Sequence, residues 1–134
     1  MKQLFFLFLL FALSPFYSRA QCSIYVSDAT GAFGAGYNND NAPTTIQECR
    51  DVAIKACREK GGTNCVVMKE SYQSGWWGFA NGQKADGRNY FQGIGGASSK
   101  SEAEAKVRQA YREGGGAGAD KIPVYTWYAY SNPK

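Results

Sequence analysis

The chain has 134 residues, with 15 lysines and arginines, 11 aspartates and glutamates, and a formal net charge of +4. This charge is too small for the basic surface that nucleic acids or anionic membranes require. The chain has no histidine, which excludes Ser-His-Asp and Cys-His catalysis and any zinc or haem site that needs histidine. We therefore expect no nucleic-acid partner, no metal and no cofactor.

The chain begins with an apolar leader. Lys2 precedes ten apolar residues at 4–13, and small residues at Ser18 and Ala20 occupy the two positions that a signal peptidase reads. Ten residues are too few to span a bilayer as a helix. We expect a signal peptide over residues 1–20, cleavage after Ala20, and a secreted or periplasmic mature chain with no transmembrane segment. Residues 21–134 then form a single domain with 13 basic and 11 acidic side chains.

The first half of the mature chain reads as two strands, a helix and a closing strand. An alternating strand, the turn "DATG" and a glycine-rich strand cover residues 22–37. A helix follows near 45–60, capped by Thr44 or Thr45, with Glu48 near its third position. Its apolar stripe consists of Ile46, Cys49, Ala53, Ala56 and Cys57. "CVVMKESY" then forms the closing strand.

The second half repeats the same order of signals, displaced by 54 residues. The turn "NGQKADG" joins two strands, and a helix near 99–113 is capped by Ser98 or Ser99, with Glu102 near its third position. Its apolar stripe consists of Ala103, Val107, Ala110 and Tyr111, and "IPVYTWYAY" forms the closing strand. The sequence therefore predicts two β-β-α-β repeats, over about 23–73 and 77–131.

These repeats predict an α+β domain stabilised by disulfides. An apolar stripe about 100° wide needs one sheet face to cover it. We expect a mainly antiparallel, six-stranded sheet with both helices on one face.

The four cysteines indicate two disulfides, because an even number in an exported chain is typical of disulfide bonding. Their spacings lack the C-x-x-C pattern of a zinc site. Cys57 ends the first helix and Cys65 opens the next strand, so a short glycine-rich turn should bring them together. Cys22 enters the first strand and Cys49 lies on the helix stripe expected to cover it, so we expect these two to form the second pair.

The first half resembles the Domain of Unknown Function 4189 family. The residues that carry the resemblance are "YVSDATGAFGAGYNND", the Ala- and Cys-bearing helix, "CREKGGTNCVVM" and "GWWGFANG", over roughly 23–82. The family's cysteine near the closing strand is absent here, with Gly75 or Trp76 in its place. The second half matches only through the internal repeat. The resemblance implies an exported bacterial protein and brings no established catalytic residues.

Because histidine-based catalysis is excluded, a pair of carboxylates is the remaining kind of catalytic site. The candidates in or near turns and strand ends are Asp28, Asp40, Glu70, Asp86 and Asp120. A glycosidase would need two of them across a cleft, whereas turns favour aspartate for conformational reasons alone. We therefore expect a protein that is not an enzyme.

The aromatic residues are the candidate binding groups. Neighbouring side chains of a strand point to opposite faces, so one of Trp76 and Trp77 should be buried and the other should mark an open sheet face. That face carries Trp127 with either Trp76 or Trp77, depending on register, and Tyr128 is a further candidate. Exposed aromatics bind sugars or proteins, but they also cover sheets and dimer contacts.

The sequence favours a secreted, non-enzymatic binding protein of unknown ligand, such as an inhibitor or immunity-type factor that binds a protein or glycan of the cell envelope. The alternative is a small carbohydrate-active protein that binds or cleaves cell-wall glycan with Trp76, Trp77 and Glu70. A third possibility is an exported structural domain without a specific ligand.

Overall fold

The computed structural model of the chain describes residues 22–39 and 45–130, so the predicted signal peptide and its cleavage site lie outside the described residues. The described part is α+β, as predicted, with two helices and two antiparallel sheets. The first sheet has the order β2-β1-β3 and the second the order β5-β4-β6. The elements are β1 (Cys22–Val26), β2 (Phe33–Tyr37), α2 (Ile46–Glu59), β3 (Val66–Ser71), β4 (Gly75–Gln83), β5 (Asn89–Ala97), α3 (Lys100–Glu113) and β6 (Val124–Ala129).

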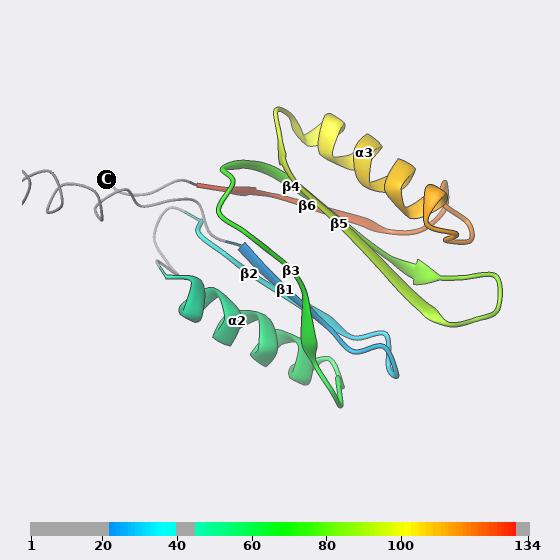
Figure 1. The fold of residues 1–134 in the computed structure, drawn as a ribbon, viewed down its shortest axis with the longest axis horizontal. Coiled ribbons are helices and arrows are strands. Elements are labelled where there is room, and N and C mark those ends of the chain that lie inside the picture. The colour runs from blue at the N-terminus through cyan, green and yellow to red at the C-terminus, as the bar shows by residue number, and fades with distance from the viewer. Residues whose placement is uncertain (1–21, 40–44, 131–134) are drawn as a thin grey trace, which may run out of the picture.

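The two sheets pack against each other between the two helices. Figure 1 shows α2 on the outer side of the sheet that contains β1, and α3 on the outer side of the sheet that contains β4. The layers therefore follow the order helix, sheet, sheet, helix. The predicted single six-stranded sheet with both helices on one face is wrong.

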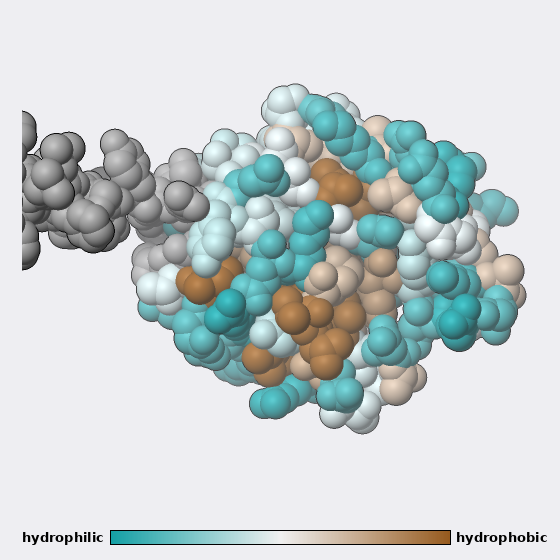
Figure 2. All heavy atoms as spheres, viewed as in Figure 1, coloured by the Kyte–Doolittle hydropathy of each residue, from teal (hydrophilic) through white to brown (hydrophobic). Residues whose placement is uncertain are grey.

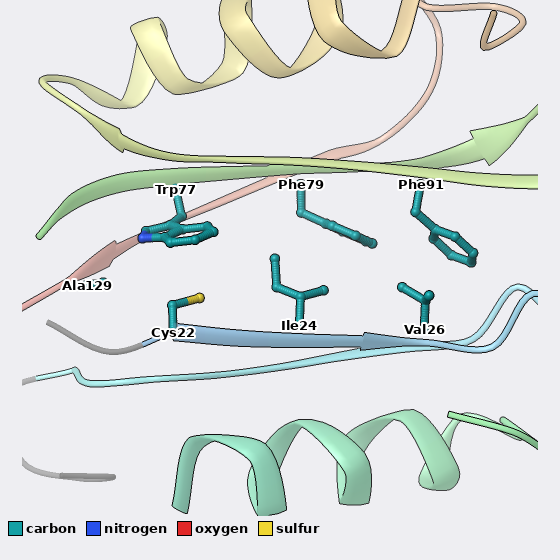
Figure 3. Packing of buried hydrophobic residues seen from close by; sticks show 7 residues of the cluster. All are labelled: Cys22, Ile24, Val26, Trp77, Phe79, Phe91 and Ala129. Carbon is teal, nitrogen blue, oxygen red and sulfur yellow. The ribbon is translucent and has the colours of Figure 1, made fainter. Parts of the chain in front are cut away.

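Large apolar side chains on the second face of each sheet explain the difference. Ile24 of β1 and both Trp77 and Phe79 of β4 point away from the helices and into the space between the sheets (Figure 3). In a single sheet covered on one side, these residues would face water. Stacking the sheets instead buries them, and burying one large apolar side chain stabilises a fold by about 1.5–3 kcal/mol. The core between the sheets consists of Cys22, Ile24, Val26, Trp77, Phe79, Phe91 and Ala129.

Both predicted helices begin at a capping side chain. The Thr45 hydroxyl accepts a hydrogen bond from the backbone N–H of Glu48 at 3.1 Å, and the Ser99 hydroxyl accepts one from that of Glu102 at 3.1 Å. These bonds satisfy N–H groups that have no partner within the helix. The structure thus selects Thr45 and Ser99 from the predicted alternatives.

Glycines in β2 let α2 lie close to the first sheet. Gly34 and Gly36 face the helix, and a Cβ atom on either would overlap the α2 backbone, at the carbonyl oxygens of Ala53 and Cys49 respectively. The glycine-rich stretch "FGAGY" therefore supplies a smooth surface for the helix.

Replacing Gly36 with alanine should destabilise the protein by about 1–3 kcal/mol, because the added methyl group forces the α2 backbone away from the sheet. Chemical denaturation measures this change. Gly93→Ala is a matched control in β5, because its Cβ would meet mainly the flexible end of Met68, at 2.8 Å. Equal losses for the two variants would contradict the close-packing argument.

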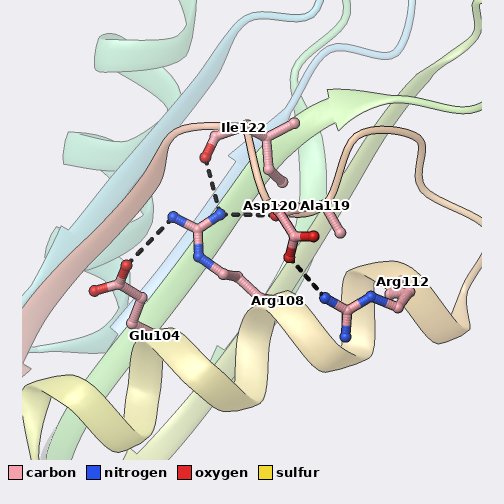
Figure 4. Close-up of polar contacts among 6 residues, drawn as sticks. All are labelled: Glu104, Arg108, Arg112, Ala119, Asp120 and Ile122. Carbon is pink, nitrogen blue, oxygen red and sulfur yellow. Dashed lines mark hydrogen bonds and ion pairs between the residues drawn. The ribbon is translucent and has the colours of Figure 1, made fainter.

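Two arginines of α3 hold the connection that leads into β6. The Arg108 guanidinium donates to the carbonyl oxygens of Ala119 at 2.7 Å and Ile122 at 3.1 Å, and Arg112 contacts Asp120 at 2.9 Å (Figure 4). These contacts replace solvation of the loop carbonyls and fix where β6 begins. The start of β6 is thereby tied to the helix.

Both halves show the order strand, strand, helix, strand, and each sheet has the first strand of its half at the centre. The predicted helix positions and closing strands are confirmed. That residues 23–73 and 77–131 are repeats of one structural unit, whose backbones should superpose, stays a prediction.

Candidate functional site

The adjacent tryptophans of β4 occupy different environments. Trp77 is fully buried between the sheets, where its indole lies parallel to that of Trp127, with 6.3 Å between ring centroids. Gly95 leaves room for the Trp77 ring, because a Cβ there would overlap it. Trp76 points to the opposite face and is half-buried beside Tyr128. The predicted asymmetry, with one tryptophan in the core and the other outside it, is confirmed.

The predicted open sheet face is wrong, because the second sheet covers the face opposite each helix. Trp127 stacks on Tyr37 at 5.3 Å as well as on Trp77, and it belongs to the margin of the core between the sheets. Of the four candidate binding residues, Trp77 is therefore enclosed and Trp127 is engaged in packing. Only Trp76 and Tyr128 retain surface positions on one face.

Trp76, Tyr128 and Tyr130 together form what we call the aromatic cluster. The ring of Tyr128 meets Trp76 edge-on at 5.7 Å and Tyr130 edge-on at 4.8 Å. Tyr128 is 39% exposed and Tyr130 43% exposed. These edge-to-face arrangements are favourable for aromatic pairs, so the rings hold one another in place at the surface.

Strand pairing positions the aromatic cluster. Trp76 pairs with Tyr128 across β4 and β6, so the two side chains share a face. The backbone N–H of Tyr130 donates to the carbonyl oxygen of Asn38 at 3.0 Å, which joins the end of β6 to the first sheet. Sequence reasoning left Tyr130 out of the candidate site, although period-2 alternation along "VYTWYAY" places it on the same face as Tyr128.

Three exposed valines lie on β3 and α2, which sequence reasoning did not single out. In Figure 2, apolar residues gather over β3 and α2, where Val52, Val66 and Val67 are between 44% and 50% exposed. The helix α2 packs on β1 and β2 and leaves the outer side of β3 largely uncovered. Scattered aliphatic exposure is ordinary on protein surfaces, so these valines do not define a site.

Three of the five candidate carboxylates are held by arginines. Both carboxylate oxygens of Glu70 lie 3.0 Å from Nε of Arg50, which joins β3 to α2. Asp86 contacts Arg88 at 2.7 Å, and the backbone N–H and guanidinium of Arg88 keep the pKa of Asp86 below its usual value. Arg112 holds Asp120, as described above. Asp28 lies in the turn between β1 and β2, and Asp40 lies outside the described residues.

The cysteines form one of the two predicted disulfides. Cys57 is bonded to Cys65, with 6.3 Å between their Cα atoms, which confirms this pair. The predicted Cys22–Cys49 bond is wrong, because both residues carry thiols. Cys22 points into the core between the sheets (Figure 3), whereas Cys49 lies on the buried side of α2, across the first sheet. Burial raises the pKa of both thiols, that of Cys49 to about 11.

Within residues 22–39 and 45–130, no group of three or more cysteine, aspartate or glutamate side chains could hold a metal ion. In the same ranges, no helix has the length and apolarity needed to cross a membrane. Comparison with models of protein families, with curated proteins and with solved structures finds no match. The resemblance to the Domain of Unknown Function 4189 family stays a prediction.

Proposed function

We propose that the protein is exported and acts as a non-enzymatic binding protein, with the aromatic cluster as its recognition surface. The observation that carries this proposal is the exposure of Tyr128, on the paired strand β6, and of Tyr130, just after it, in edge-to-face contacts. Tyrosine and tryptophan dominate the binding energy of many interfaces because they bury a large area with few rotatable bonds. A cluster that is already ordered loses little conformational entropy on binding.

The Cys57–Cys65 disulfide supports export, because such bonds persist in oxidising compartments. The apolar leader at 1–20 supports the same destination. The partner is then a protein or glycan of the cell envelope or extracellular space.

A glycan is the second candidate partner, since sugars stack on exposed aromatic rings. A protein that only binds glycan needs surface aromatics, which the aromatic cluster provides. A protein that cleaves glycan was predicted to use Trp76, Trp77 and Glu70. Trp77 is fully buried and Glu70 is bound to Arg50, so only Trp76 of that set is available to a ligand.

Binding of the purified protein to panels of envelope proteins and cell-wall glycans tests this function. Replacing Tyr128 or Tyr130 with alanine should cost about 2 kcal/mol of binding free energy, which is roughly a thirty-fold loss of affinity. Tyr72→Ala is the control, because Tyr72 is 48% exposed and makes no ring contact with the aromatic cluster. A partner that binds all three variants like the unmodified protein would contradict the assignment of this surface.

A further inference from the structure

A hollow of about 710 Å³ lies near the end of β4 that is farthest from the aromatic cluster. It is formed between the turn that joins β1 to β2 and the hairpin that joins β4 to β5. Its wall includes Asp28 of the turn, and Lys84, Arg88, Asn89 and Tyr90 of the hairpin and the start of β5. Small-molecule sites in proteins usually have volumes of about 300–1,000 Å³, so the hollow is large enough for one.

Asparagine side chains hold the two walls of the hollow together. The Asn89 amide donates to the carbonyl oxygen of Asp28 at 2.7 Å, and the Asn81 amide donates to that of Gly31 at 3.4 Å. The hairpin is itself closed by a hydrogen bond from the Lys84 N–H to the Arg88 carbonyl oxygen at 2.9 Å. The shape of the hollow is therefore set before any ligand arrives.

Two cationic groups of the wall are available to an anion. The Lys84 ammonium lies 5.0 Å from the centre of the Tyr90 ring, and within the described part of the chain it forms no ion pair. Arg88 uses Nε to contact Asp86, which leaves the two terminal nitrogens of its guanidinium for a ligand. An ammonium and a guanidinium that line the same hollow are suited to a carboxylate or a phosphate.

The wall that contains Asp28 favours a different chemical group of the ligand. Asp28 presents an exposed carboxylate, which accepts hydrogen bonds from hydroxyl groups and repels a bare anion. A suitable ligand therefore carries an oxyanion at one end and hydroxyl groups at the other. We propose that this hollow binds an acidic sugar, with its carboxylate or phosphate between Lys84 and Arg88 and its hydroxyl groups donating to Asp28.

Titration of the disulfide-bonded protein with glucuronate and with glucose 6-phosphate tests the proposal, with backbone amide NMR shifts as the readout. We expect at least one of the two acids to shift the amides of residues 28–29 and 84–90, and the stronger ligand identifies the preferred anionic group. Glucose and inorganic phosphate should each bind at least about ten-fold more weakly, since each lacks one of the two recognised features.

Lys84→Gln and Arg88→Gln should each weaken binding of the acidic sugar by about ten-fold. Lys100→Gln is the charge-matched control at the start of α3, beside the other end of β4, and should leave the affinity unchanged. Because two independent variants are measured, a loss of affinity that is caused by misfolding of one variant can be recognised. Equal binding of glucose, equal binding of inorganic phosphate, shifts elsewhere in the protein, or no shift at millimolar ligand would each overturn the proposal.

Discussion

Replacing Trp77 with alanine should lower the free energy of unfolding by about 3–5 kcal/mol. Trp77 is fully buried between the sheets, where it stacks on Trp127 and fills the space above Gly95. Truncation removes this contact and leaves a cavity that the paired strands of both sheets cannot close. Because domains of this size are stable by about 5–15 kcal/mol, the loss is a large share of the total. Denaturant titration followed by circular dichroism measures it.

Trp76→Ala is the matched control for this variant. The two residues are neighbours on the same strand and lose the same atoms, but Trp76 is half-buried and contacts mainly Tyr128. We expect its replacement to cost about 1–2 kcal/mol and to affect partner binding more than stability. Similar unfolding free energies for the two variants would show that the burial asymmetry does not exist in solution.

Alkaline pH should destabilise the protein through the buried thiols of Cys22 and Cys49. In the unfolded chain a thiol has a pKa near 8.5, whereas burial raises the pKa of both thiols in the folded state, to about 11 for Cys49. Below the unfolded pKa both states keep their protons, so the stability is fully present. Above it only the unfolded thiols ionise, and each lowers the stability by about 1.4 kcal/mol per pH unit until the folded pKa is reached.

Between pH 8.5 and 10 the two thiols together should lower the free energy of unfolding by about 3 kcal/mol, because the unfolded thiols are only half ionised at pH 8.5. Denaturant titrations at several pH values measure this loss, and a Cys22→Ala, Cys49→Ala double variant supplies the baseline for all other titrating groups. Without reductant, alkylation should modify two cysteines in the unfolded protein and none in the folded one. An intact second disulfide, or the same pH dependence in the double variant, would contradict the thiol assignment.

Local signals predicted the elements of this fold well, for reasons that lie within a few residues. Thr45 and Ser99 cap their helices through a bond to a residue three positions later, which any short window of sequence contains. The Cys57–Cys65 bond closes a loop with a sequence separation of 8, so the end of α2 and the start of β3 bring the two sulfurs together. The opposite orientations of Trp76 and Trp77 follow from the two-residue period of a strand.

The prediction of a Cys22–Cys49 disulfide was wrong because this bond depends on which face of β1 is turned toward α2. Helix periodicity placed Cys49 correctly on the buried stripe. Strand periodicity allowed Cys22 to point either way, and a change of one residue in register exchanges the two faces. The inter-sheet core contains Ile24 and Val26, and Cys22 shares their face. Only the presence of the second sheet decides that this face points away from the helix.

By itself the sequence determined the helices, the strands, their order, the short disulfide and the absence of histidine chemistry, because each depends on residue identity or on local spacing. The tertiary structure decided that six strands divide into two stacked sheets, since that choice depends on burying Ile24, Trp77 and Phe79 together. It also decided that Trp127 packs against the margin of the core, on Tyr37 and Trp77, while Tyr130 joins Trp76 and Tyr128 at the surface. Lys84, Arg88 and Asp28 meet around one hollow because two turns far apart in the sequence lie at the same end of the stacked sheets.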